Sequence, residues 1–273
     1  MLNWFRFMMR RKEWVLASLV SVPRLIKIVW CMFCRSENST EYPLFLKIDL
    51  SPMCNLHCTC CIHAGKVGDG GLLDQQHFHS KQRMSLNNYK EIIDEVRGKT
   101  TSIVLHYLGE PYMYSEIDEA ARYAYDAGIR VHIGSNFSFS FTDERIDSIL
   151  NSGVTDLTVC VDGLTQELYE KTRVGGKIDR VLHNLERLCK RRKELNIKHL
   201  HIEVQYIRFE HNKHEENSIC NMVFQFGVDQ FSSFNGNTGN WVNRDPSSEF
   251  YQYKETKPKR SLGLLPYCYR PYI

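Results

Sequence analysis

Four cysteines lie within a short stretch early in the chain. They are Cys54, Cys58, Cys60 and Cys61, and three of them follow a C-x3-C-x2-C spacing. Thiolates are the usual protein ligands of soft iron centres, and three of them can hold three irons of a four-iron cluster. The fourth iron then keeps an open position, as in catalytic metal sites. The spacing predicts a 4Fe-4S cluster held by Cys54, Cys58 and Cys61.

Three other uses of these thiols stay open at this point: a zinc knot that includes Cys60, a redox dithiol, and buried structural thiols. Zinc sites usually draw two separated ligand pairs, and no second C-x2-C pair follows at a finger-like spacing. A bacterial ferredoxin would show C-x2-C-x2-C with a further cysteine before a proline, which this run does not. Iron–sulfur binding is favoured, and the choice of Cys61 over Cys60 rests on spacing alone.

Polar and glycine-containing motifs follow downstream, three of them where predicted strands end. They are Leu108-Gly109-Glu110-Pro111, Gly134-Ser135-Asn136, Val159-Cys160-Val161-Asp162-Gly163, and the run from Tyr169 through Arg173 to Gly176. Glycine permits close approach of the backbone to a ligand, and Glu110 offers a charged hydrogen-bond acceptor. The planar guanidinium of Arg173 suits a carboxylate. Alone, a Gly-Glu-Pro turn is more often only a loop, and a simple capped turn explains Gly134-Ser135-Asn136 equally well.

The cysteine spacing and these motifs resemble the radical S-adenosylmethionine (radical SAM) superfamily, from about residue 44 to the end of the chain. The Asp-Gly motif and the Tyr-x3-Arg-x-Gly-Gly motif are similar to those of its SPASM-associated branch. The resemblance implies that Gly109 and Glu110 bind the amino group of S-adenosylmethionine (SAM) and that Arg173 meets its carboxylate. It also assigns Asn136, Cys160 and Asp162 to the cosubstrate site, with Cys160 in place of a serine that contacts the ribose.

The reaction implied by the resemblance is reductive cleavage of SAM to a 5′-deoxyadenosyl radical, which abstracts hydrogen from a substrate. The branch implies a peptide, protein or carbohydrate-type substrate, bound near residues 205–208 and 234–241. Reduced flavodoxin or ferredoxin is the expected electron donor, and no catalytic side chain is assigned. The alternative is a degenerate, non-catalytic zinc- or cluster-binding protein, because Cys60, Leu108 and Cys160 depart from the family pattern.

Strand and helix patterns alternate between these motifs. Strands are expected at 44–50, 102–107, 130–133, 156–161, 201–207 and 230–234, and helices at 85–97, 116–126, 143–150, 178–194 and 215–226. This order predicts a parallel sheet with right-handed crossovers. Because six units are too few for a closed eight-unit barrel, we expect an α/β fold with a partial (β/α)6 barrel of the radical SAM type. Its chemistry belongs at the C-terminal ends of the strands.

The chain divides into three expected parts: a basic and apolar N-terminal helical arm with a linker (1–42), the core domain (43–240) and a tail (241–273). The tail resembles the beginning of a SPASM extension. Charged Arg24 and Lys27 interrupt the apolar stretch of the arm, which argues against a membrane-spanning helix. Peripheral membrane contact through residues 1–33 and packing against the barrel or a partner both stay open.

Charge and cysteine distribution indicate the cellular compartment of the protein and the classes of partner to expect. The 273 residues carry a net charge of +3, which is too small to indicate a nucleic-acid partner. The cysteines cluster rather than spreading as a disulfide framework would, which fits the reducing cytoplasm. We expect a cytoplasmic protein, with membrane association through the arm left open.

Overall fold

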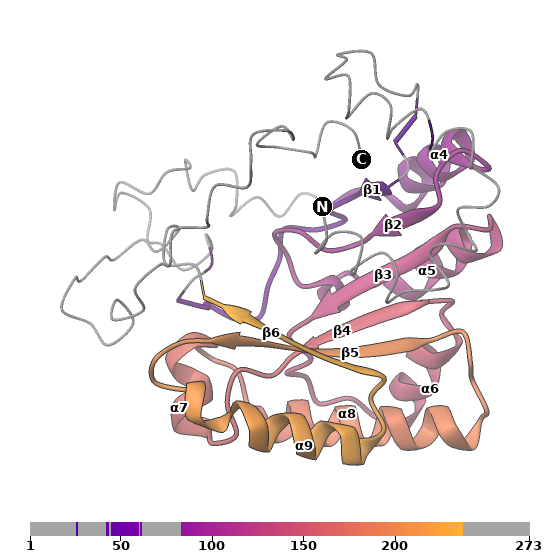
Figure 1. Cartoon of the computed structure of the whole chain (residues 1–273). Helices are drawn as coiled ribbons and strands as arrows, with labels where there is room; N and C mark the ends of the chain where they lie inside the picture. The colour runs from indigo at the N-terminus through magenta and orange to yellow at the C-terminus, as the bar shows by residue number, and fades with distance from the viewer. Residues whose placement is uncertain (1–25, 27–41, 44, 60, 62–82, 237–273) are drawn as a thin grey trace, which may run out of the picture.

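A computed structural model describes Ile26 and residues 42–43, 45–59, 61 and 83–236. Within these residues one six-stranded sheet has the order β1-β2-β3-β4-β5-β6, and every neighbouring pair is parallel (Figure 1). The strands are β1 (Phe45–Lys47), β2 (Ser102–Val104), β3 (Arg130–Ser135), β4 (Asp156–Cys160), β5 (His201–Arg208) and β6 (Gln230–Asn235). Sequential strands are therefore neighbours, as right-handed crossovers through helices produce.

Helices connect the strands and lie on one face of the sheet (Figure 1). They are α4 (Leu86–Val96), α5 (Ile117–Asp126), α6 (Asp143–Asn151), α7 (Gln166–Thr172), α8 (Ile178–Glu194) and α9 (Glu216–Phe226), with 3-10 turns η4 (Pro111–Met113) and η5 (Lys213–Glu215). Ser85, Thr142 and Thr165 cap α4, α6 and α7, because each hydroxyl accepts a backbone N–H of the first turn. These caps fix where those three helices begin.

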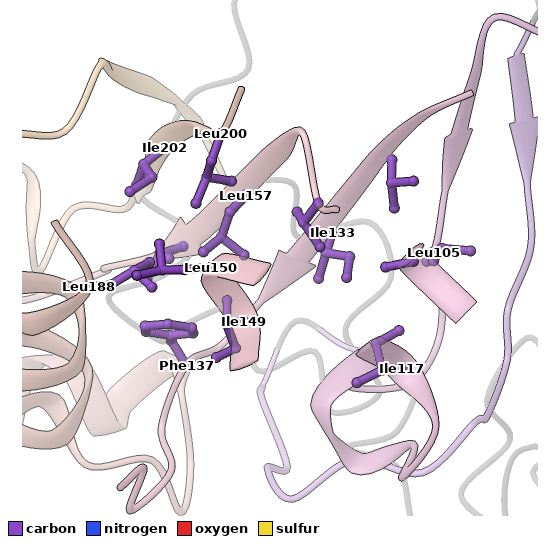
Figure 2. Close-up of a cluster of buried hydrophobic side chains, with 14 of the residues drawn as sticks. Leu105, Ile117, Ile133, Phe137, Ile149, Leu150, Leu157, Leu188, Leu200 and Ile202 are labelled. Carbon is purple, nitrogen blue, oxygen red and sulfur yellow. The ribbon is translucent and has the colours of Figure 1, made fainter. Parts of the chain in front are cut away.

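The apolar core lies between the sheet and its helices. Alternate strand residues such as Ile133, Leu157 and Ile202 are fully buried and pack against helix residues such as Ile149 and Leu188 (Figure 2). In a strand, successive side chains point to opposite faces, so the intervening residues face the other side of the sheet. The apolar core therefore occupies the helix-covered face of the sheet, and the candidate site residues lie at the ends of the strands.

The expected α/β fold is confirmed: the sheet is parallel and open, as in a partial barrel, because β1 and β6 form its two edges among the described residues. The boundaries differ in places. Strands β1 and β2 end at Lys47 and Val104, earlier than expected, and α7 is a helix that the pattern analysis did not predict.

The predictions for the N-terminal arm and the tail lie outside the described residues, apart from Ile26, which is helical, and Tyr42 in the linker. Among the helices that the structure describes, none combines the length and the apolar character needed to cross a bilayer.

Candidate functional site

The cysteine loop follows β1 at the C-terminal edge of the sheet. Cys54 and Cys61 are half-buried and Cys58 is buried, and all three are free thiols. The Cys61 amide donates to the Cys58 carbonyl oxygen at 3.0 Å, which turns the chain back on itself. Burial raises the pKa of Cys54 to about 12, and the nearby negative charges of Glu110, Cys58 and Cys61 add to the effect. The three thiols therefore share one electrostatic neighbourhood, while Cys60 lies outside the described residues.

The turn after β2 packs directly against this loop. The Glu110 amide donates to the Met53 carbonyl oxygen at 2.8 Å. A Cβ added at Gly109 would lie 1.9 Å from the Ser51 carbonyl oxygen, a backbone atom that cannot rotate away. Leu108, which replaces the first glycine of the family motif, donates its amide to Asp49 Oδ2 at 3.3 Å. Gly109 is thus required by the packing of the cysteine loop itself.

The Glu110 carboxylate is buried and accepts three hydrogen bonds. Its Oε1 accepts from Ser135 Oγ at 2.7 Å and from the Tyr112 amide at 3.3 Å, and its Oε2 accepts from the Asn136 amide at 2.8 Å. Burial nevertheless outweighs these donors and the charge of Arg173, and it raises the Glu110 pKa to about 7. A carboxylate desolvated in this way is well suited to receive a cationic group.

Asn136 links the third strand to the cysteine loop. Its Nδ2 donates to Asn55 Oδ1 at 2.8 Å and lies 4.0 Å from Cys54 Sγ, while its Oδ1 accepts from the Ser138 amide at 2.9 Å. Asn55 Nδ2 returns a hydrogen bond to the Ser138 carbonyl oxygen at 3.1 Å. The expected Asn136 therefore belongs to the site, through contacts with the loop that carries Cys54.

Strand β4 brings the remaining expected residues together. Asp162 is fully buried; its Oδ2 accepts from Arg173 Nε at 2.5 Å and its Oδ1 accepts from the Ile207 amide at 2.7 Å. Arg173 Nη1 lies 3.9 Å from Cys58 Sγ. Burial raises the pKa of Cys160 to about 11, with Arg173 opposing the effect. The nine expected site residues thus lie at or after the C-terminal ends of β1, β2, β3 and β4 and, for Arg173, directly after α7.

The three free thiols Cys54, Cys58 and Cys61 are ligands of the type that a four-iron cluster takes. In the described part of the chain, no three His, Cys, Asp or Glu side chains converge tightly enough to hold one metal ion. A four-iron cluster does not require that convergence, because each thiolate binds a different iron. Burial and nearby negative charges raise the pKa of Cys54, and bonding to the cationic iron–sulfur core would stabilise its thiolate against both effects.

Several residues of the site were not predicted. Ser135 holds Glu110, Asn55 holds Asn136, and Asn212 donates to the Asp162 carbonyl oxygen at 2.9 Å. Ser135 and Asn55 lie within the motifs, so their positions were visible in the sequence, but their hydrogen-bond partners lie 25 and 81 residues away. At the expected substrate position, Gln205 is half-buried and Phe234 is exposed, while residues 237–241 lie outside the described residues.

Comparisons with known proteins show the family of the chain. The family model of the radical SAM superfamily matches residues 48–206. The AdoMet-dependent heme synthase of Methanosarcina barkeri is 30% identical over 154 residues, which are 55% of this chain and 40% of that protein. The mycofactocin maturase MftC of Mycolicibacterium smegmatis is 26% identical, over 63% of this chain and 39% of that protein. The chain thus spans about two fifths of the length of these curated relatives.

Solved structures share the fold. Streptococcus suis SuiB bound to S-adenosylmethionine superimposes with a TM-score of 0.59 at 16% identity, over 77% of this chain and 45% of SuiB. The family uses a 4Fe-4S cluster and SAM, and its matched segment contains all nine expected site residues. The chain belongs to the radical SAM superfamily.

Proposed function

We propose that this chain is a radical SAM enzyme whose 4Fe-4S cluster is held by Cys54, Cys58 and Cys61, and that it modifies a peptide. A 4Fe-4S cluster held there would supply the one electron needed for reductive cleavage of SAM to methionine and a 5′-deoxyadenosyl radical, and hydrogen abstraction from the substrate would follow. The observation that carries the proposal is the meeting of three free thiols with the buried Glu110 carboxylate and Arg173 at one edge of the sheet.

The chain's own residues bind and orient the cosubstrate. Glu110, buried and held by Ser135 and Asn136, receives the amino group of SAM, because a cation compensates the desolvation of its carboxylate. Arg173 lies beside Cys58 and is anchored by Asp162, and its planar guanidinium suits the carboxylate of SAM. Cys160, half-buried at the end of β4, lines the same site.

A peptide is the substrate that the comparisons favour. SuiB has also been solved with its precursor peptide SuiA, and that structure superimposes on this chain with a TM-score of 0.59 at 15% identity. Another relative is a maturase. We place the substrate at the ends of β5 and β6, beside Gln205 and Phe234, and assign reduced flavodoxin or ferredoxin as the electron donor. Residues 43–240 form the core domain of this proposal.

Anaerobic reconstitution with iron and sulfide tests the proposal. The protein is expected to hold about four irons per chain and, once reduced with dithionite, to convert SAM into 5′-deoxyadenosine. Deuterium transfer from a labelled candidate peptide into deoxyadenosine then tests the substrate class, with a labelled sugar as the comparison. A protein that retains zinc and cleaves no SAM would overturn the proposal. Transfer from the sugar alone would overturn the peptide assignment.

A further inference from the structure

The cysteine loop forms a short backbone ladder with the segment that follows α7. The His57 amide donates to the Val174 carbonyl oxygen at 3.0 Å, and the Thr59 amide donates to the Thr172 carbonyl oxygen at 3.0 Å. The two strands of this ladder run in opposite directions, so the residues between the bonded pairs lie opposite each other. These residues are Cys58 and Arg173, and the backbone alone therefore brings them together.

This register brings the Arg173 side chain close to the Cys58 sulfur. Its Nη1 lies 3.9 Å from Cys58 Sγ while its Nε donates to Asp162 Oδ2 at 2.5 Å. Arg173 and Asp162 are both shielded from water, because their side chains are only 12% and 1% exposed. A charge–sulfur contact in such surroundings is screened much less than one at the surface.

Asp162 is itself held rigidly by the neighbouring strand. Its Oδ1 accepts the Ile207 amide at 2.7 Å, and its carbonyl oxygen accepts from Asn212 Nδ2 at 2.9 Å. Asn212 is fully buried, and its Oδ1 accepts the Phe209 amide at 2.7 Å. The Asp162 carboxylate therefore holds the Arg173 guanidinium in place beside the cysteine loop.

We infer that Arg173, positioned by Asp162, hydrogen-bonds the Cys58 sulfur and raises the reduction potential of the cluster bound there. The inference rests on the proposed function, since it requires the cluster, and it adds a role for Arg173 besides contact with SAM. Reduction adds a negative charge to the cluster, part of which lies on the thiolate sulfurs. A fixed cation and an N–H donor at one sulfur stabilise the reduced form over the oxidised form.

The contact is tested by pulsed EPR of the reduced, reconstituted protein labelled with [15N]arginine and free of SAM. We expect a weak 15N coupling to the cluster, which Arg173→Lys removes and Asp162→Asn weakens, because the arginine then loses its anchor. A wild-type spectrum without the coupling overturns the inference, even if Asp162→Asn fails to fold. A coupling unchanged in Asp162→Asn overturns the positioning role of Asp162.

The redox effect is tested by EPR-monitored titration of the same samples. Arg173→Gln is expected to lower the midpoint potential, and Arg173→Lys, which keeps the charge, to lower it less. The matched control is Arg130→Gln, which breaks another shielded pair, Arg130 Nη2 to Asp156 Oδ2 at 3.0 Å, at the opposite end of the sheet. It is expected to leave the potential unchanged. Equal potentials in wild type and Arg173→Gln overturn the inference, whereas a protein without a four-iron cluster overturns the proposed function instead.

Discussion

Glu110 shows at the scale of one residue how burial and hydrogen bonding compete. Three donors favour its charged form, yet removal from water dominates and raises its pKa to about 7. A buried carboxylate of this kind is costly unless a cation arrives. Glu110 therefore lowers the stability of the empty protein near neutral pH, and that cost is recovered when a cationic group binds.

The pH dependence of stability follows from this shift. The pKa of Glu110 is higher in the folded protein than in the unfolded chain. The stability that protonated Glu110 contributes is therefore fully present below about pH 4.5 and is lost as the pH rises through 7. The free energy of unfolding of cluster-free protein should fall over this window by an amount on the order of 3 kcal/mol attributable to Glu110. Urea unfolding at pH 5 and pH 8 measures it.

Glu110→Gln should remove most of that slope, because the substituted side chain does not titrate. Exposed Glu167 provides the control, since Glu167→Gln should leave the slope as in wild type. An equal slope in wild type and Glu110→Gln would show that Glu110 is not the titrating group.

Adjacent Cys60 and Cys61 give a second test at residue scale. The C-x3-C-x2-C spacing selects Cys61 as the third ligand, and Cys61 is turned toward Cys58 by its backbone hydrogen bond. Cys61→Ala should abolish formation of 5′-deoxyadenosine, whereas Cys60→Ala should keep it, as measured by chromatography after anaerobic reduction. The reverse pattern would make Cys60 the ligand.

Residue types near the motifs could be predicted from the sequence, but their partners could not. Spacing predicted the three cysteines, and the resemblance of the motifs to those of the family predicted Glu110 and Arg173. The contact from Asn212 to Asp162 joins positions 50 residues apart, and the one from Asn136 to Asn55 joins positions 81 apart. Such pairs depend on strand order and register, which local patterns do not contain.

At the scale of elements, two neighbours hold the cysteine loop: the turn after β2 and the segment after α7. The first contact depends on the missing side chain of Gly109, and the second on backbone bonds from His57 and Thr59. Helix α7, which leads into that segment, was not predicted because it has only seven residues. Its Thr165 cap was a local signal for it.

Gly109→Ala tests the first contact. The new Cβ would lie 1.9 Å from the Ser51 carbonyl oxygen, so the cysteine loop must move. We expect the free energy of unfolding to fall by about 1–3 kcal/mol or more, and iron incorporation to fall with it. Chemical unfolding and iron analysis check the two effects.

Gly98→Ala is the matched control, because Gly98 has a positive φ of 70° but open space around its Cα. It should cost about 1–2 kcal/mol and leave iron incorporation as in wild type. Full iron incorporation in Gly109→Ala would contradict the role given to this packing.

At the scale of the molecule, the two faces of the sheet differ in the polarity of their side chains. The helix-covered face is apolar, whereas the other carries polar residues in register: Thr158 Oγ donates to Glu203 Oε2 at 3.3 Å and Gln230 Nε2 donates to Glu203 Oε1 at 3.0 Å. Closed barrels fill that face with branched apolar side chains. The alternation of strands and helices was enough to predict the open parallel sheet, because each unit buries one apolar face.

We propose that three cysteines hold the cluster and leave one iron for SAM. Mössbauer spectroscopy of protein reconstituted with 57Fe, recorded before and after addition of SAM, tests it most directly. The account predicts a four-iron spectrum in which one iron of the four changes its parameters when SAM binds. Four irons that all stay unchanged, or a protein that takes up zinc in place of an iron–sulfur cluster, would contradict it.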